Sequence, residues 1–312
     1  MRQVFIECLR HLALFQREFL LLTICLYVGC SASEPPPFLV DNTQKPLVIP
    51  NFETPTAICT DGTYHYVANM GKYLLPVSLD GDGYISKITP SGRIIRRKFL
   101  TGLDAPSDLM VVDSMLLMTD VDRIKGFTLS SGEQILDISF LGGTINNMAY
   151  DGEEFLYVTA RFTNRIYRTS LKTYTSQLLT EEILSPNGIT YDPASHSLYI
   201  SQFFHDGSGN ILNYSLKENK VNDTGTTSYH GFLDGLSAVT ANQFLFTDWH
   251  HPVKAGKIGW GSTRTSNYTM VDLHEYIQNP TDVFLDTTRN FLWVIDLTGN
   301  RVVSFSVQTP TQ

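Results

Sequence analysis

The sequence has little charge and almost no clustering of basic residues. Charged residues make up 17% of the 312 residues, whereas an average domain has roughly 25%. The net charge is −8, and the one run of three basic side chains is Arg96-Arg97-Lys98. Such a chain offers nothing that could track a phosphate backbone, so we expect no nucleic-acid partner.

Long apolar runs are also scarce. The uncharged stretch from Phe19 to Gly29 is 11 residues long, whereas about 20 residues are needed to cross a bilayer. Arg10 and Arg17 precede this stretch, and the polar SASEPPP follows Cys30, which is typical of a signal-peptide core. The sequence LYVGC resembles a bacterial lipobox. We therefore predict a lipoprotein-type signal peptide over 1–29, lipidation at Cys30 and a tether over 30–44, with secretion without an anchor as the alternative.

Cysteine is the third scarce feature. Cys8 and Cys25 leave with the predicted signal peptide and Cys30 would carry the lipid, so Cys59 stands alone in the mature chain. This count excludes a disulfide framework and a CxxC metal or redox site. We expect Cys59 to act as a small buried hydrophobic side chain. The location expected is the cell envelope, as a periplasmic or surface lipoprotein that touches the membrane only through its anchor.

The sequence does contain an internal repeat. A motif of Pro, a small or polar residue, Gly or Asp, and an aliphatic residue recurs with variations before six strand-like runs, at intervals of 51, 39, 41, 47 and 47 residues. The six occurrences are Pro55-Thr56-Ala57-Ile58, Pro106-Ser107-Asp108-Leu109, Ile145-Asn146-Asn147-Met148, Pro186-Asn187-Gly188-Ile189, Leu233-Asp234-Gly235-Leu236 and Pro280-Thr281-Asp282-Val283.

Each repeat holds short alternating segments separated by turn residues, without a helical period. Six such units predict an all-β six-bladed β-propeller over residues 45–312. The last unit has too few segments, and Pro46-Leu47-Val48-Ile49 is expected to supply its outer strand and close the ring. A β-sandwich, the alternative architecture, would not explain a repeat that stays in register.

In a propeller the innermost strand of each blade lines the central axis. The loop that enters this strand lies on the same face of the ring as the loop joining the second and third strands. The residues expected to converge on that mouth of the channel are Glu53 to Thr56, Ser107, Asn146, Asn187, Asp234 and Thr281. The loops expected around them carry Asn69, Asp120, Arg161, His205, Asp248, Trp249, His250, His251 and Asp296.

Four of the converging residues are oxygen donors, namely Glu53, Asn146, Asn187 and Asp234. Two carboxylates and two amides suit a hard divalent cation, above all Ca²⁺, which takes carboxylate, amide and water oxygens. These ring positions hold neither His nor Cys, which disfavours a structural zinc site. The alternative is that these Asn and Asp residues serve local hydrogen bonds where a strand or turn begins.

The order of these motifs resembles that of the senescence marker protein/gluconolactonase/luciferin-regenerating family of six-bladed propellers, over residues 50–308. Glu53-Thr54-Pro55 is similar to the E-x-P that enters the first blade of that family, Pro186-Asn187-Gly188 to the Asn-Gly of the fourth, and Asp234-Gly235 to the Asp-Gly of the fifth. The resemblance implies that the Glu, Asn and Asp of these motifs bind a divalent metal, and that Asn146 lies near metal and substrate.

One position departs from the family. Its sugar-lactonase members have Arg two residues before the Asn of the third blade, where this chain has Thr144. Paraoxonase-type and drug-responsive bacterial lactonases are similar in layout. The resemblance therefore implies a lactone or ester hydrolase in general and does not imply a sugar substrate.

These observations predict an exported, membrane-anchored, divalent-metal-dependent hydrolase of a small lactone or ester. In this hypothesis the metal polarises the carbonyl group, and Asp234 is both a ligand and the catalytic residue that accepts the water proton. The residues expected to bind substrate are Asn146, His205, Trp249 and His250. The alternative is a non-catalytic envelope propeller that binds a ligand or protein at its mouth. We expect a monomer in either case.

Overall fold

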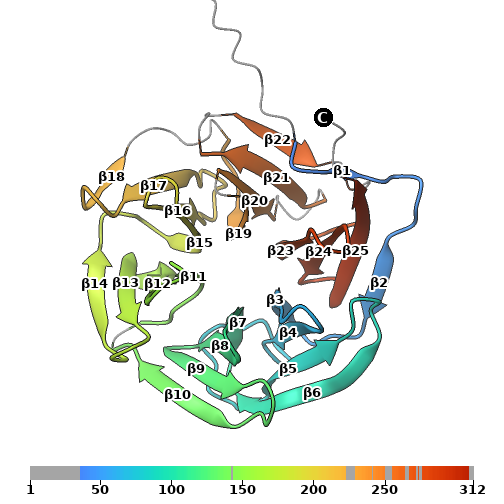
Figure 1. The fold of residues 1–312 in the computed structure, drawn as a ribbon, viewed down its shortest axis with the longest axis horizontal. Coiled ribbons are helices and arrows are strands. Elements are labelled where there is room, and N and C mark those ends of the chain that lie inside the picture. The colour runs from blue at the N-terminus through green and yellow to red at the C-terminus, as the bar shows by residue number, and fades with distance from the viewer. Residues whose placement is uncertain are drawn as a thin grey trace, which may run out of the picture. The chain divides into compact units, whose positions relative to one another are not determined.

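The computed structural model describes residues 36–141, 143–222, 229–240, 242–249, 255–263, 267–271, 273 and 276–308. The predicted signal peptide, Cys30, His250 and His251 lie outside these residues. The segment Pro36–Gln312 forms one compact unit, built almost entirely of strands (Figure 1). Within the described residues, no helix has both the length and the apolar character needed to cross a bilayer.

Six antiparallel sheets stand in a ring around a central axis, which confirms the predicted six-bladed β-propeller (Figure 1). Blade 1 consists of β3 (Pro55–Thr60), β4 (His65–Asn69), β5 (Gly83–Ile88) and β6 (Ile94–Leu103). Blade 2 consists of β7 (Pro106–Val112), β8 (Met115–Asp120), β9 (Arg123–Thr128) and β10 (Gln134–Ser139). Blade 3 consists of β11 (Met148–Tyr150), β12 (Phe155–Ala160), β13 (Arg165–Ser170) and β14 (Ser176–Thr180), with the short 3₁₀ turn η1 (Arg161–Thr163).

Blade 4 consists of β15 (Pro186–Asp192), β16 (Ser197–Gln202), β17 (Ile211–Ser215) and β18 (Lys220–Asn222). Blade 5 consists of β19 (Leu233–Thr240), β20 (Gln243–Asp248), β21 (Lys257–Ser262) and β22 (Tyr268–Val271). Blade 6 consists of β23 (Pro280–Asp286), β24 (Phe291–Asp296) and β25 (Arg301–Gln308), completed by β1 (Leu39–Val40) and β2 (Leu47–Pro50).

The N-terminal segment closes the ring as predicted. Strand β2 pairs antiparallel with β25, with Leu47 opposite Ser304. Strand β1 pairs with the far end of β25, where Leu39 lies opposite Gln308. Phe38 is buried in the core shared by blades 5 and 6. The segment predicted as a tether, 30–44, thus includes a second short strand on the edge of β25, which the sequence pattern did not reveal.

The repeated motif marks the start of the innermost strand in every blade. Five of these strands begin at the first residue of the motif, and β11 begins at its fourth residue, Met148. In blades 1, 2, 4, 5 and 6 the register against the second strand shifts within the first residues, which marks a β-bulge or a similar irregularity. A β-bulge bends a strand and changes the direction of its side chains. In these blades the irregularity lies at the start of the innermost strand, next to the mouth of the channel.

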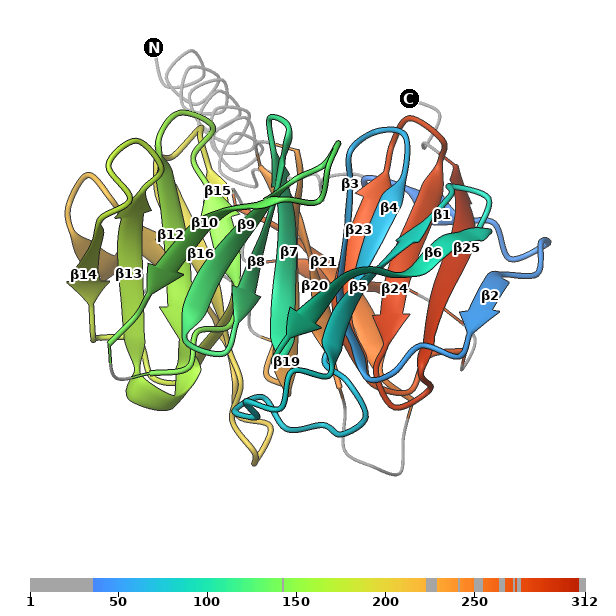
Figure 2. The ribbon, with the colours of Figure 1, turned by 90° about the horizontal axis from the view of Figure 1, so that it is seen from below.

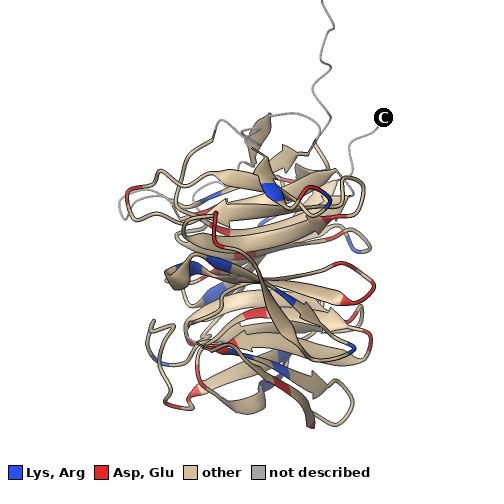
Figure 3. Cartoon of the chain, turned by 90° about the vertical axis from the view of Figure 1, so that its left-hand side faces the viewer, with Lys and Arg blue, Asp and Glu red and all other residues tan. Residues whose placement is uncertain are grey.

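The core lies between the blades. Each second strand is almost wholly buried, as in β4 and β20, because both faces of a blade pack against neighbouring blades. One apolar cluster joins Leu245 of blade 5 to Val283 and Val294 of blade 6. Cys59 is a free, partly buried thiol packed beside the cluster of blades 1 and 2, and burial raises its pKa. Charged residues of both signs are interspersed over the side of the propeller shown in Figure 3.

Candidate functional site

The mouth of the channel holds a cavity of about 80 Å³ where several predicted residues meet. Its polar lining comes from the starts of the innermost strands and from the loops after the second strands. The polar residues are Thr56, Ser107, Asn146, Asn147, Arg161, Asn187, Asp234, Trp249 and Thr281. Its apolar lining is Met70, Leu74, Pro76 and Leu297. Three of the four predicted metal ligands, Asn146, Asn187 and Asp234, therefore share one cavity with Trp249, and Asn146 and Trp249 are two of the four predicted substrate-binding residues.

Hydroxyl groups of the second strands hold the mouth residues in place. Thr159 Oγ1 of blade 3 donates to the carbonyl of Asn187 in blade 4 at 2.6 Å, and Ser201 Oγ of blade 4 donates to the carbonyl of Asp234 in blade 5 at 2.7 Å. Thr119 Oγ1 of blade 2 holds Asn146 of blade 3 in the same way at 2.6 Å. Blades 2, 3 and 4 thus each fix the backbone of the mouth residue in the next blade, so the site depends on how the blades are assembled in the ring.

Asp234 is the carboxylate of this cavity. Its Oδ1 accepts a hydrogen bond from Asn187 Nδ2 at 2.6 Å. Burial raises the pKa of Asp234 to about 7, against the opposing effects of the Arg161 charge and of the nearby Trp249 and Asn187 side chains. A carboxyl group with this pKa can both take up and release a proton near neutral pH, which suits general acid–base chemistry.

Arg161 brings a positive charge to the same cavity. It directly follows β12 in the turn η1, and its guanidinium carbon lies 4.2 Å from the ring centroid of Phe203. Its backbone N–H donates to Asn146 Oδ1 at 3.3 Å. Burial lowers the pKa of Arg161 while the charge of Asp234 opposes this. The cavity is therefore lined by both a guanidinium and a carboxylate, and a guanidinium can bind a carbonyl or carboxylate oxygen.

Two buried polar atoms at this cavity, Thr281 Oγ1 and the indole Nε1 of Trp249, make no hydrogen bond of normal geometry within the described part of the chain. The Trp249 side chain nevertheless lies close enough to Asp234 to lower the pKa of that carboxyl. Thr281 is only 8% exposed. A buried hydroxyl or N–H without a partner costs free energy, so such groups usually meet a water molecule or a ligand. An oxygen atom of a ligand in the cavity could accept hydrogen bonds from these two groups.

Glu53 is not part of the cavity. Its side chain is exposed, and its backbone carbonyl accepts the N–H of Gly71. Burial, followed by the charge of Glu53, raises the pKa of Tyr84 to about 12, so the carboxylate lies beside the phenol of Tyr84 in β5. The structure therefore does not bring the predicted four-ligand set together, because the exposed Glu53 lies near Tyr84 and does not line the cavity.

His205 lies at the edge of the site. It is exposed, and its Nε2 is 3.4 Å from a guanidinium nitrogen of Arg161. It does not belong to the lining of the cavity. His250, the remaining predicted substrate-binding residue, is outside the described residues.

Several acids near the mouth have structural roles instead. Asp120 Oδ1 accepts the backbone N–H of Ala105 at 2.8 Å, and Asp296 Oδ1 accepts that of Asn279 at 3.0 Å. Asp120 also forms an ion pair of 2.6 Å with Lys125. These side chains at the ends of second strands fix the loop that enters the innermost strand of their own blade. They share the site's face without contributing to its chemistry.

The oxygen donors that remain for a cation are Asp234, Asn187 and Asn146. Among the described residues no group of three His, Cys, Asp or Glu side chains could hold a metal ion. One carboxylate and two amides around a small cavity nevertheless form an oxygen donor set of the type that Ca²⁺ accepts, with water completing the coordination. The set fits a weakly held cation, because it carries a single negative charge beside Arg161.

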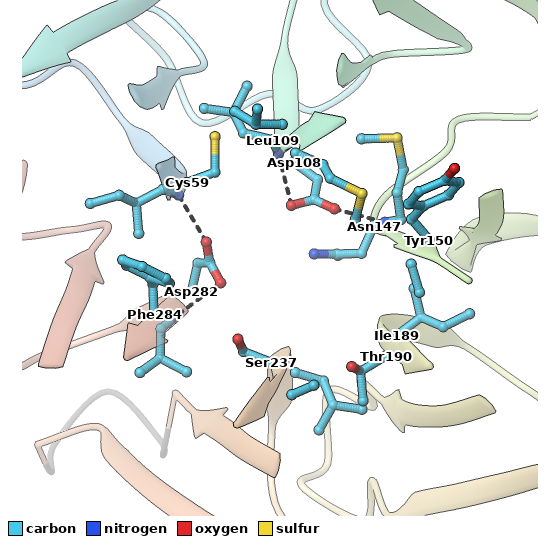
Figure 4. Close-up of a pocket in the computed structure, with 18 of the residues that line it drawn as sticks. Cys59, Asp108, Leu109, Asn147, Tyr150, Ile189, Thr190, Ser237, Asp282 and Phe284 are labelled. Atoms are coloured by element: carbon cyan, nitrogen blue, oxygen red, sulfur yellow. Dashed lines mark hydrogen bonds between the residues drawn. The ribbon is translucent and has the colours of Figure 1, made fainter. Parts of the chain in front are cut away.

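A second, larger cavity of about 400 Å³ lies along the same axis and is lined by residues further along the innermost strands. Asp108 of β7 and Asp282 of β23 point into it from different blades (Figure 4). Asp108 accepts the N–H groups of Leu109 and of Met148, the latter at 2.7 Å. Asp282 accepts those of Val283 and of Ile58, both at 2.8 Å. Each acid thus links its blade to the next one, and both acids are engaged by backbone donors.

Sequence reasoning placed Arg161 near the mouth but did not include it in the site. It also missed the hydroxyl groups of Thr119, Thr159 and Ser201. The signal for the hydroxyls is visible in retrospect, since Thr or Ser occupies the last or next-to-last position of the second strand in four blades. The role of Arg161 has no such signal, because only the packing of η1 turns its guanidinium inward.

No protein-family model matches the chain, and no curated protein matches it. Among solved structures, it is similar to a structural genomics protein of unknown function from Bacteroides thetaiotaomicron, with 14% identity and a TM-score of 0.62 over 82% of this chain and 70% of that one. It is similar to the Kuenenia stuttgartiensis hydrazine synthase, with 13% identity and a TM-score of 0.58 over 81% and 77% of the two chains. A chain of a nidogen/laminin complex matches with 18% identity and a TM-score of 0.53 over 73% and 91%. At these identities the likeness establishes the propeller fold alone.

Proposed function

We propose that this propeller is a hydrolase of a small lactone or ester and that the reaction takes place in the cavity at its mouth. The observation that carries the proposal is Asp234, whose pKa is raised to about 7 beside Arg161 and next to two unpartnered donors. A base, a positive charge and hydrogen-bond donors directed at one small space are the elements that ester hydrolysis requires.

In this proposal Asp234 acts as the general base. It takes a proton from water as the water oxygen forms a bond to the carbonyl carbon. The carbonyl oxygen then carries negative charge, which the guanidinium of Arg161 and the free donors of Trp249 and Thr281 stabilise. When the bond between carbon and the alkoxide oxygen breaks, Asp234 returns the proton to that oxygen, and the products are a carboxylic acid and an alcohol, joined in one molecule if the substrate is a lactone.

A divalent cation is part of the proposal. Asp234, Asn187 and Asn146 are the residues that would hold it, and Ca²⁺ is the cation expected from oxygen donors. When bound, it would polarise the carbonyl group and lower the pKa of a nearby water molecule. With or without the cation, Asn187 also orients the carboxylate of Asp234, because its Nδ2 donates a hydrogen bond to that carboxylate.

The test is a screen of lactones and aryl esters with the purified protein, once after treatment with a chelator and once with added Ca²⁺. We expect hydrolysis that the chelator weakens and Ca²⁺ restores. Saturating cation should also stabilise the fold, by about 2.7 kcal/mol when its concentration is roughly 100 times its dissociation constant. Binding of a test compound without turnover in all conditions would contradict the enzyme and favour the non-catalytic binding propeller.

We also propose that the enzyme is exported and that Cys30 carries its lipid anchor. The support is the uncharged run that ends in Gly29-Cys30. Mass spectrometry of the native N-terminus tests this. A lipid-modified Cys30 is expected, and an unmodified chain that begins at Ser31 or later would contradict the anchor.

A further inference from the structure

The cavity at the mouth is bordered on one side by an apolar loop that projects from the ring. This loop joins β4 to β5 and includes residues 70–82. Figure 2 shows it extending beyond the blades at the lower side of the view. Its exposed large apolar side chains, between 48% and 73% exposed, are Tyr73, Leu74, Leu75, Val77 and Leu79. A soluble protein that presents so many apolar side chains within one short segment usually binds something there.

The conformation of the loop is fixed by polar contacts at its base. The backbone N–H of Lys72 donates to Asp82 at 3.0 Å, and that of Gly81 donates to Asp104 at 3.2 Å. Gly71 has a φ of +115°, and a Cβ there would collide with Asp82. These contacts close the loop without covering its apolar side chains. The exposure of Tyr73 to Leu79 is therefore built into the fold.

The loop is continuous with the proposed site. Leu74 and Pro76 line the same cavity as Asp234 and Arg161. The cavity has about 80 Å³, whereas a cavity of about 150 Å³ is known to take up benzene. It can admit the reacting carbonyl group and little else. The remainder of a substrate must then lie outside, and the surface it meets when it leaves past Leu74 is apolar.

We infer that Tyr73–Leu79 is a specificity-determining segment that binds the apolar part of an amphiphilic substrate. The inference rests on the proposed function for the identity of the polar end, a lactone or ester carbonyl. The segment supplies the other half of recognition, namely an alkyl or aryl tail that lies against Leu74 and Pro76 and continues onto the exposed side chains. A sugar lactone, which is polar on all sides, would gain nothing from this surface.

The experiment uses γ-lactones that carry methyl, butyl or octyl side chains. Their binding to the full-length Asp234→Asn protein is measured by calorimetry, since this variant keeps the shape of the site without its base. Their hydrolysis by the wild-type protein is measured in parallel. We expect affinity to rise about fourfold for each methylene group that the segment fully covers. Affinity that does not change from methyl to octyl would overturn the inference.

Two variants locate the effect. Leu74→Ser should flatten the dependence on tail length, and Leu79→Ser should weaken it for octyl alone, because Leu79, unlike Leu74, does not line the cavity. The matched control is Leu178→Ser on the outer strand β14, because Leu74 and Leu178 are 49% and 51% exposed. Melting temperatures show that each variant folds. A loss of tail dependence in the control as large as in Leu74→Ser would contradict the assignment to the loop.

The two proposals fail in different ways. If the wild-type protein hydrolyses none of the lactones but binds the octyl compound more tightly than the methyl compound, the proposed function is wrong and the segment is still a binding surface. Sedimentation with phosphatidylcholine vesicles provides the remaining arm. If vesicles bind wild-type protein and not Leu74→Ser, while tail length has no effect on lactone binding, the loop attaches to a membrane surface and the inference is overturned.

Discussion

The mouth and the inner channel both contain buried carboxyl groups of raised pKa, but their hydrogen bonding differs. Asp108 and Asp282 in the channel each accept two backbone N–H groups, one of them from the next blade. Asp234 at the mouth accepts one side-chain hydrogen bond from Asn187 and lies beside Arg161. The comparison shows that a shifted pKa alone does not identify a functional acid.

The partners of each acid separate the two roles. An acid whose carboxylate oxygens accept backbone N–H groups from two blades has a structural role. Its hydrogen bonds form when the protein folds and hold the two blades together. An acid held by side chains, in a cavity that also contains unpartnered donors, still has capacity for a ligand. We therefore assign structure to Asp108 and Asp282 and chemistry to Asp234.

The largest expected effect is the loss of activity in Asp234→Asn. Removal of a general base lowers the rate by about 10²- to 10⁴-fold, and we expect this fall in kcat/KM for the best lactone found. The melting temperature should change little, because the amide oxygen of Asn can still accept the hydrogen bond from Asn187 Nδ2. Asp206→Asn, in the exposed loop of blade 4, is the control and should keep its activity. Full activity of Asp234→Asn would contradict the assignment of a catalytic role to Asp234 and a structural role to Asp108 and Asp282.

The next effect is on stability and concerns the channel. Asp108→Ala leaves the buried N–H groups of Leu109 and Met148 without an acceptor, at a cost of about 1–3 kcal/mol for each unsatisfied group. Denaturant unfolding at pH 6 should show the loss. Activity per folded molecule should fall far less than in Asp234→Asn. If Asp108→Ala unfolds too readily for assay, Asp282→Ala tests the same type of contact between blades 6 and 1.

The stability of the fold and the activity of the site should respond to pH in opposite directions. Burial, followed by the charge of Asp282, raises the pKa of Asp108 to about 8, from 3.8 for a free side chain. The folded state then binds a proton that the unfolded state has lost, so the free energy of unfolding should decrease as the pH rises from about 6.5 to 8. Asp108→Asn should reduce this slope. A wild-type stability that increases over this range would contradict the assignment.

Activity, in contrast, should increase over the same range. Asp234 must be ionised to act as a base, and its pKa is about 7, so kcat/KM should rise through pH 7 and level off above it. Arg161 lowers this pKa through its charge. Arg161→Met should therefore move the midpoint of the pH profile upward as well as slow the reaction. A midpoint that stays in place would show that the profile reports another group.

The smallest expected effect is that of Glu53→Gln. The resemblance to the gluconolactonase family implies that Glu53 is a metal ligand, whereas the structure places its side chain outside the cavity, beside Tyr84. We expect the stabilisation by Ca²⁺ to stay the same in this variant and to fall in Asn187→Ala. The melting temperature with and without Ca²⁺ is the measurement. A loss in Glu53→Gln equal to that in Asn187→Ala would return Glu53 to the site.

The sequence by itself determined the fold and the face that carries the candidate site. The six motifs recur at the spacing of blades, and in five of them the first residue begins the innermost strand, because Pro, Asn and Asp favour the turn that precedes a strand. Closure by Leu47–Ile49 was also predictable, since the last repeat lacks one segment and an unpaired edge would remain. The sequence could not show that Leu39–Val40 adds a further strand, because two residues carry no periodicity.

Only the tertiary structure decided which polar residues share a cavity. Asn187 and Asp234 are 47 residues apart in sequence, yet Asn187 Nδ2 lies 2.6 Å from Asp234 Oδ1. Their motifs placed them at the mouth, but the same reasoning placed Glu53 there, and only the structure shows that Glu53 does not line the cavity. The direction of the Glu53 side chain, the inward turn of Arg161 and the exposure of Tyr73–Leu79 depend on how loops pack at the mouth. The local sequence pattern determines where a strand begins. The direction of a side chain depends on contacts between blades, which the sequence pattern does not reveal.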